Sequence, residues 1–356
     1  MLIVKPIILL ELPNTIHSIW SELQKKSFLP NFQYEFEYIS AWAKYFRGNW
    51  RPLLLLVKND DQVKGILPLM YKDEKRKRIL PYRRVRFLGS GRTDFNVLLA
   101  DKKDVEDVAA AALNWLCSGY LRWEILILDD IVEENPLIKA ILRWAEKSCV
   151  EFSTKKGKYY YINLKCSWDD IWNNTSRKFI RKNINVARNR LNRAGQWKIT
   201  VDPEWETERI VDEAIKISSL RGYNMGSLLS SWKNQRKFLG EIIESSRGKG
   251  NFHSYWMELN DIIIAYEFIF EQENVCYAWN GTFNPSYAEL SPSRLLILEI
   301  IKNYHEKRFS EFNFMRGEAE YKSKWTPYYK KSYRFIIKNK KNIYGRLILF
   351  LEKLFI

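Results

Sequence analysis

Three strand-like segments at hairpin spacing, followed by one capped helix, constrain the fold of this chain more than any other feature. The segments cover residues 252–258, 262–270 and 275–282, and the helix is expected over 292–307. Turns of a few residues join neighbouring strands as antiparallel pairs. The helix is apolar on nearly every side from Leu295 to Ile301, so it must pack against a sheet. The pattern predicts an open, mixed sheet covered by helices.

The first half of the chain repeats this order of elements. Three strands, a helix and a further strand are expected there, at 52–58, 62–71, 85–89, 104–118 and 123–128. The second half begins with a long basic helix, residues 176–194, that ends at Gly195. No residue-level repeat relates the halves, so a tandem arrangement follows from element order alone. We expect an N-terminal half over 1–160, a C-terminal half over 161–340 and a basic, apolar tail over 341–356.

The net charge narrows the range of partners. Lys and Arg number 58 against 42 Asp and Glu, which gives a formal charge of +16. Such an excess suggests an anionic partner, which is nucleic acid, a phosphorylated cofactor or an acidic membrane face. The chain of 356 residues is 46% hydrophobic and 28% charged, which excludes a wholly disordered chain and fits two globular domains.

The histidines and cysteines predict neither a metal site nor a secreted protein. His17, His253 and His305 are far apart in the sequence, and there is no H-E-x-x-H motif. The four cysteines form no C-x-x-C pair, so we expect buried free thiols in a reducing compartment, with disulfides as the alternative. The N-terminal segment is predicted as a first strand rather than a signal peptide, and no run is apolar enough for a membrane span. These features predict a cytoplasmic protein.

The loop before the helix at 292–307 suits a phosphate group. Ser291 is a candidate N-cap, with Pro292 at the first helical position. A helix N-terminus offers unpaired N–H groups and a positive dipole end, and Arg294 would add a charged donor. The alternative is a well-capped core helix that binds no ligand.

A family resemblance is carried by the segments Pro285–Tyr287, Leu290–Leu296 and Phe312–Trp325, together with the basic helix at 176–195. Their order and spacing resemble the C-terminal signature of GNAT-fold acyltransferases related to CelD, a group associated with cellulose, exopolysaccharide and cell-envelope glycan synthesis. The first half resembles this group more loosely, through residues 40–42, 65–69, 87–90 and 94–95. The sequence departs from the group's pattern at three positions, with serine in place of glycine at Ser293 and asparagine in place of aspartate at Asn284 and Asn313.

The resemblance implies a fold and an activity. The fold is α/β (α+β), with tandem GNAT-like domains that are each a mixed, mostly antiparallel sheet flanked by helices. The activity is transfer of an acyl group from acetyl-CoA or another acyl-CoA to an amino sugar, a nucleotide-linked sugar or a cell-envelope glycan precursor, without a metal. The group is similar to the Fem peptidyl transferases, so an aminoacyl-tRNA-dependent peptidyl transferase is an alternative. A non-enzymatic nucleic-acid-binding protein is a second alternative, for which the sequence offers no recognised motif.

Acyl transfer to an amine needs a general base, and Glu267 is the first candidate. It lies in the middle of a predicted strand, where its face-mates Ile263, Ala265 and Ile269 are apolar. Desolvation on such a face would raise the pKa of the carboxyl group towards the range of a base that works at neutral pH. The alternative is a solvated or salt-bridged carboxylate on a rim strand.

Three further residues are candidates for catalytic roles. Asp94 aligns with an acidic position in the first half of the family and would bind or deprotonate the acceptor. Glu318 follows a strand end, a usual place for site residues in open sheets. Tyr321 would give a proton to the leaving thiolate or pack on the ligand. The alternatives are a turn-capping aspartate for Asp94 and a core tyrosine for Tyr321.

The resemblance also implies ligand contacts. In GNAT folds the strand at 275–282 splays to admit the donor, which places Trp279 and Asn280 at the cofactor, although strand alternation lets only one of them face it readily. The donor pyrophosphate would lie at the helix N-terminus, at Ser291, Ser293 and Arg294. The residues predicted to bind the acceptor or its phosphates are Asp94, Arg177, Arg181, Arg316 and Lys322. For Lys322 a solvated ammonium group is the alternative.

Two basic runs and the tail complete the sequence features. Residues 72–86 hold eight Lys and Arg, and residues 176–193 hold seven, of which Arg177, Arg181 and Arg188 fall near one helical face. Solvated surface is the alternative for both runs. The tail carries an apolar stripe behind a basic run, as a docking helix or an interfacial anchor. We expect the first run and the tail to favour the inner face of a membrane, and the second run to serve a phosphorylated substrate.

Overall fold

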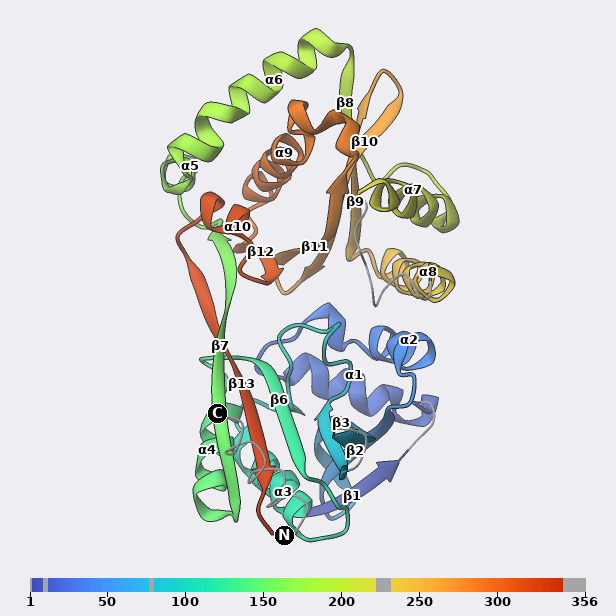
Figure 1. The fold of residues 1–356 in the computed structure, drawn as a ribbon, viewed down its shortest axis with the longest axis vertical. Coiled ribbons are helices and arrows are strands. Elements are labelled where there is room, and N and C mark those ends of the chain that lie inside the picture. Colours follow the sequence, from blue (N-terminus) through green and yellow to red (C-terminus); the bar gives the residue numbers. More distant parts are fainter. Residues whose placement is uncertain (1, 9–11, 77–79, 222–231, 342–356) are drawn as a thin grey trace. The chain divides into compact units, whose positions relative to one another are not determined.

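The computed structural model describes residues 2–8, 12–76, 80–221 and 232–341 (Figure 1). The chain forms two compact units. Unit 1 runs to Gly157 and takes up the chain again from Lys331, and unit 2 covers Lys158–Lys330. The boundaries fall within two strands, β7 (Val150–Asn163) and β13 (Tyr329–Asn339).

Unit 1 is built on a sheet of order β1-β2-β3-β4-β6-β13. Its strands before β13 are β1 (Leu2–Ile8), β2 (Arg51–Asn59), β3 (Gln62–Arg76), β4 (Leu80–Phe87), β5 (Leu99–Ala100), which pairs with β3, and β6 (Ile125–Val132). The pair β4 and β6 is parallel, and the other neighbours are antiparallel. The helices of unit 1 are α1 (His17–Lys26), α2 (Phe36–Phe46), α3 (Val105–Cys117) and α4 (Leu137–Lys147), with short 3-10 turns at Asn14–Ile16 and Phe32–Tyr34.

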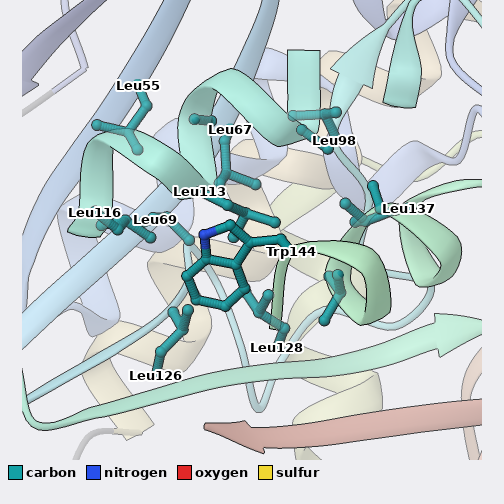
Figure 2. Packing of buried hydrophobic residues seen from close by; sticks show 14 of the residues in the cluster. Leu55, Leu67, Leu69, Leu98, Leu113, Leu116, Leu126, Leu128, Leu137 and Trp144 are labelled. Atoms are coloured by element: carbon teal, nitrogen blue, oxygen red, sulfur yellow. The ribbon is translucent and has the colours of Figure 1, made fainter. Parts of the chain in front are cut away.

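The core of unit 1 lies between its sheet and the helices α3 and α4 (Figure 2). Alternate residues of β2 and β3, such as Leu55 and Leu67, point to this side because successive side chains of a strand face opposite ways. Leu113 of α3 and Trp144 of α4 pack onto them. Burial of these apolar side chains is the main source of stability for the unit.

Unit 2 repeats the arrangement with the sheet order β8-β9-β10-β11-β12-β7. Its strands besides β7 are β8 (Trp197–Val201), β9 (Phe252–Leu259), β10 (Ile262–Gln272), β11 (Val275–Phe283) and β12 (Glu311–Arg316). Only β11 and β12 run parallel among these described pairs. The helical elements are α5 (Trp168–Asn174), the π-helical turn η3 (Arg177–Arg181), α6 (Lys182–Ala194), α7 (Thr207–Leu220), α8 (Trp232–Lys249), the 3-10 segment η5 (Pro285–Leu290), α9 (Pro292–Glu306) and α10 (Glu320–Trp325).

The predicted fold class is confirmed: each unit is a mixed, mostly antiparallel sheet flanked by helices. The predicted division at residue 160 and the observed one after Gly157 lie close together. The chain from Lys331 onward belongs to unit 1, although it was predicted with the second half, because β13 pairs with β6. The predicted tail, apart from Lys341, lies outside the described residues.

The cysteines and the lengths of the helices bear on two further expectations. All four cysteines are free thiols, but only Cys276 is buried; Cys117 and Cys166 are half-buried and Cys149 is exposed, so the prediction of buried thiols is confirmed only for Cys276. Cys149 lies between the end of α4 and the start of β7 and is not part of the core cluster of unit 1. None of the helices in the described ranges is long and apolar enough to cross a membrane.

Candidate functional site

Strands β11 and β12 of unit 2 diverge in the middle of the sheet. Their parallel pairing covers only Val275–Tyr277 of β11, opposite Glu311–Asn313 of β12. Strand β11 continues along β10 as far as Phe283, whereas β12 has an irregularity after Asn313, where Met315 adopts a positive φ of 59°. The predicted splay of this strand is therefore present, and it opens an edge of β11 beyond Tyr277.

Glu267 lies on β10 directly across from Gly281 of β11, beside this divergence. The side chain is buried, with 8% of the residue exposed, and its face-mates Ala265 and Ile269 belong to the core. Burial raises the pKa of Glu267 to about 8, although the positive charge of Lys322 acts in the opposite direction. The desolvated environment predicted for Glu267 is what the structure has, and its role as a base stays a prediction.

Gly281 leaves the space that the Glu267 carboxylate occupies. A Cβ atom at position 281 would lie 2.8 Å from Oε1 of Glu267 and closer still to Oε2. The carboxylate therefore reaches across β11 above a residue that has no side chain. Sequence reasoning missed Gly281, and the signal that could have found it is the cross-strand pairing of Glu267 with a glycine in a predicted hairpin.

Lys322 is buried on α10, and its ammonium group is held by the end of β12. Nζ donates hydrogen bonds to the carbonyl oxygens of Met315, at 3.1 Å, and Arg316, at 2.7 Å. The alternative of a solvated lysine is therefore wrong. Because α10 follows β12 after the turn at Gly317, its first turn brings the ammonium group back under the strand end. This places a positive charge close enough to Glu267 to act on its pKa.

Trp279 and Asn280 lie at a bulge in the pairing of β10 with β11. The register passes from Phe268–Asn280 to Ile269–Ala278, which leaves Trp279 as the extra residue. Its ring contacts Phe270, and Asn280 accepts a hydrogen bond from the Tyr266 hydroxyl at 2.7 Å. Phe270 and Tyr266 share one face of β10, so the expectation that Trp279 and Asn280 point to opposite sides is wrong. A bulge breaks strict alternation, which explains the difference.

The N-terminus of α9 stands directly after η5. Ser291 is the N-cap, as predicted, but its φ of 52° is left-handed and its side chain makes no cap hydrogen bond. Its Oγ lies 3.5 Å from Nη1 of Arg294. The Oγ of Ser293 is buried and has no hydrogen-bond partner within the described ranges. Burial also lowers the pKa of Arg294.

Glu318 and Tyr321, the two other candidates near β12, are open to solvent. Glu318 is exposed after the turn at Gly317, which adopts a φ of 114°. Tyr321 is 51% exposed, with its ring edge-on to Phe314, so the alternative of a core tyrosine is wrong. Arg316 is half-buried at the end of β12. The catalytic roles of these residues stay predictions.

Asp94 and the arginines of the basic helix lie on other elements. Asp94 is buried in unit 1, where its backbone N–H donates to Oε1 of Gln33 at 2.6 Å. Arg177 is exposed, and the half-buried Arg181 donates to Oδ1 of Asn173 at 3.1 Å. Their contacts with an acceptor stay predictions. Within residues 2–8, 12–76, 80–221 and 232–341, no group of three or more His, Cys, Asp or Glu side chains could hold a metal.

Comparisons with known proteins agree with this geometry. A family model for the acetyltransferase (GNAT) domain matches residues 178–323. No curated protein sequence matches the chain. The GNAT part of the predicted resemblance is therefore confirmed for the second unit.

Solved structures with a similar fold cover nearly the whole chain. FemX is similar over 93% of this chain and 96% of its own, with 12% identity and a TM-score of 0.59. A tandem GNAT protein from the clavulanic acid biosynthesis pathway is similar over 93% and 98%, with 11% identity and a TM-score of 0.50. The C-terminal domain of a putative lysylphosphatidylglycerol synthetase from Agrobacterium fabrum is similar over 88% and 91%, with 13% identity and a TM-score of 0.51. The chain thus shares its fold with a tandem GNAT protein, its second unit matches the acetyltransferase (GNAT) domain over residues 178–323, and an acyltransferase is the enzyme that these findings support.

Proposed function

We propose that this protein transfers an acyl group from acyl-CoA to the amino group of an amino sugar, a nucleotide-linked sugar or a cell-envelope glycan precursor. The observation that carries the proposal is Glu267, a buried carboxylate with a pKa of about 8 that stands where β11 and β12 diverge. The resemblance to the CelD-related group supports a glycan amine as the acceptor. The reaction would take place in the cytoplasm, at or near the inner face of the membrane.

The chemistry is direct attack of the amine on the thioester. The acceptor nitrogen forms a bond to the acyl carbon, and the bond between that carbon and the CoA sulfur breaks. Glu267 takes the proton that the nitrogen loses, and the hydroxyl of Tyr321 gives a proton to the leaving thiolate. Because only the ionised carboxylate can act as the base, turnover should rise with pH through about 8.

Three features of unit 2 support the placement of the donor. The edge of β11 from Ala278 to Phe283 would receive the amides of the extended pantetheine arm, as an added strand is received. The N-terminus of α9 has a positive dipole end, which favours the pyrophosphate. The buried Oγ of Ser293 and the half-buried guanidinium of Arg294 would add donors there.

A second candidate is a Fem-like transferase that takes aminoacyl-tRNA. The observation that favours it is the similarity to FemX over 93% of this chain. In that reaction the ester of the aminoacyl-tRNA replaces the thioester, and the same base would serve. The two candidates differ in what binds at the N-terminus of α9.

Binding of CoA and acetyl-CoA distinguishes the two. At a ligand concentration of about one hundred times Kd the gain in the free energy of unfolding is about 3 kcal/mol, which raises Tm by several degrees. The Arg294→Gln variant should bind CoA about tenfold more weakly but pantetheine equally well, since only CoA carries the phosphates. Arg236→Gln, which removes an exposed arginine of α8, is the matched control. Failure of every acyl-CoA to raise Tm, with tight binding of aminoacyl-tRNA, would overturn the acyl-CoA proposal in favour of the Fem-like one.

A further inference from the structure

The outward side of η3 and α6 is strongly basic. Between Ser176 and Gln196 the sequence has seven Lys and Arg and no Asp or Glu. We define the outer face of α6 by exposed residues of these two elements, which are Arg177, Lys178, Phe179, Lys182, Val186 and Arg193. From Lys182 the offsets to Val186 and Arg193 are four and eleven residues, which lie within about 60° of one another at 100° per residue. Lys182, Val186 and Arg193 therefore share one stripe of α6, and the exposed residues Arg177, Lys178 and Phe179 of η3 precede it.

Contacts on the other sides of the helix hold this stripe in place. Ile184 and Leu191 are buried in the core of unit 2. Arg188 forms an ion pair with Glu299 of α9 at 3.0 Å, and Arg190 donates to the carbonyl oxygen of Glu289 at 2.8 Å. Figure 1 shows α6 alongside α9. That Arg177, Arg181 and Arg188 fall near one helical face stays a prediction.

Two large apolar side chains of the outer face of α6 are exposed to solvent. Phe179 is 40% exposed and Val186 is 43% exposed. The ammonium groups of Lys178 and Lys324 lie 5.4 and 4.1 Å from the centre of the Phe179 ring. An apolar ring flanked by ammonium groups presents hydrophobic surface and positive charge at the same point.

The cations of the outer face of α6 differ in their ion pairing from those of the basic run at residues 72–86. In the described part of that run, Arg83 pairs with Asp73, Arg84 with Glu74 and Arg86 with Asp129, so their charges are largely neutralised within unit 1. By contrast, within the residues that the structure describes, Lys182 and Arg193 take part in no ion pair. Lys182 and Arg193 thus keep their charge at the surface, whereas Arg83, Arg84 and Arg86 of β4 are paired.

We propose that the outer face of α6 docks unit 2 onto an anionic lipid surface, with the cations at the headgroups and Phe179 and Val186 inserted between them. Interfacial helices combine basic and apolar side chains in this way, and each Lys or Arg near an anionic leaflet adds attraction. An aliphatic side chain such as Val186 has no stacking contact to offer a nucleic acid, whereas it gains by burial among acyl chains. The stripe is also a convex helix surface rather than a groove that could follow a phosphate backbone. This inference goes beyond the proposed acyl transfer and holds for either donor.

Sedimentation with vesicles tests the proposal on the full chain. We expect binding to phosphatidylcholine vesicles that contain about one third phosphatidylglycerol, little binding to phosphatidylcholine alone, and weakening by salt. Lys182→Gln with Arg193→Gln should reduce the partition coefficient about 25-fold, since each charge contributes roughly fivefold. Phe179→Ser with Val186→Ser should also weaken binding, and the remaining binding should depend on salt as in the wild type.

The matched control removes two exposed cations elsewhere in unit 2. Lys233→Gln with Lys237→Gln on α8 changes the net charge equally and should leave binding within about twofold of the wild type. Equal losses in the two double variants would mean attraction by net charge only and would overturn the proposal. So would an absence of binding to anionic vesicles, or binding of a labelled tRNA probe that Lys182→Gln with Arg193→Gln abolishes while vesicle binding persists. Thermal unfolding of each variant checks that the helix remains folded.

Discussion

Replacing Gly281 with alanine would place a methyl group where the Glu267 carboxylate now lies. The added Cβ would stand 2.8 Å from Oε1 and closer to Oε2, well inside the ordinary contact distance of about 3.5 Å. The carboxylate is the end of a flexible side chain, so it would move by about 1 Å or more while the backbone stays in place. Gly281 does not have a positive φ, so alanine adds no backbone strain. The change therefore displaces one functional group and leaves the fold intact.

The size of the effect follows from the geometry of proton transfer. A displacement of about 1 Å of a catalytic group costs on the order of 100-fold in rate. We expect kcat/KM of Gly281→Ala to fall by about that factor, with Tm within a few degrees of the wild type. The double variant with Glu267→Gln should be no slower than Glu267→Gln alone, because both changes remove the same interaction.

Steady-state kinetics with acetyl-CoA and an amine acceptor provide the assay. Gly240→Ala is the matched control, since Gly240 lies within α8 and a Cβ there meets no atom within 4 Å. That control should keep full activity and gain slightly in stability from helix propensity. If Gly281→Ala retained activity within about threefold of the wild type, the position of the Glu267 carboxylate would not matter to the reaction, and the assignment of Glu267 as the base would be refuted.

Three further outcomes are expected from the structure. Glu267→Gln should lower kcat by about 100-fold or more and remove the rise of kcat/KM through a pKa near 8, because the amide imitates the protonated acid; a pH profile unchanged by the substitution would contradict this. Hydrogen bonds to Asp202, at 2.6 Å, and Glu271, at 3.0 Å, outweigh the effect of burial and raise the pKa of His253 to about 9. His253→Gln should therefore cost about 2–3 kcal/mol of unfolding free energy below pH 6.5, a difference that vanishes as pH rises through 9 and that denaturant titrations at several pH values would measure. Asp129 is fully buried and faces two arginines of unit 1, so Asp129→Ala should cost about 3 kcal/mol or more in urea unfolding, and a loss below 1 kcal/mol would show that the network is not coupled to stability.

Some features of the site could be predicted from neighbouring residues alone. The alternate apolar residues around Glu267 indicate on which face of β10 its side chain lies, because successive side chains of a strand point to opposite faces. That local pattern was enough to predict its burial. Ser291 and Pro292 likewise predicted the start of α9, because caps depend on residues next to one another.

Other features depend on strand partners that lie far apart in the sequence. The bulge at Trp279 turns its side chain to the same face as that of Asn280, and it arises from the register between β10 and β11. The burial of Lys322 arises from the approach of α10 to the end of β12. Periodicity within one segment carries no information on either, since both depend on how separate elements meet.

The sequence by itself determined the elements, the mixed sheet and the apolar surroundings of Glu267, because periodicity, caps and turns act over a few residues. Only the tertiary structure decided that β13 completes unit 1, since its pairing with β6 joins segments about two hundred residues apart. It also decided that Gly281 makes room for the carboxylate and that α6 turns Lys182 and Arg193 outward. These outcomes depend on the register of paired strands and on which side of a helix the core covers, and both are set by packing between distant parts of the chain.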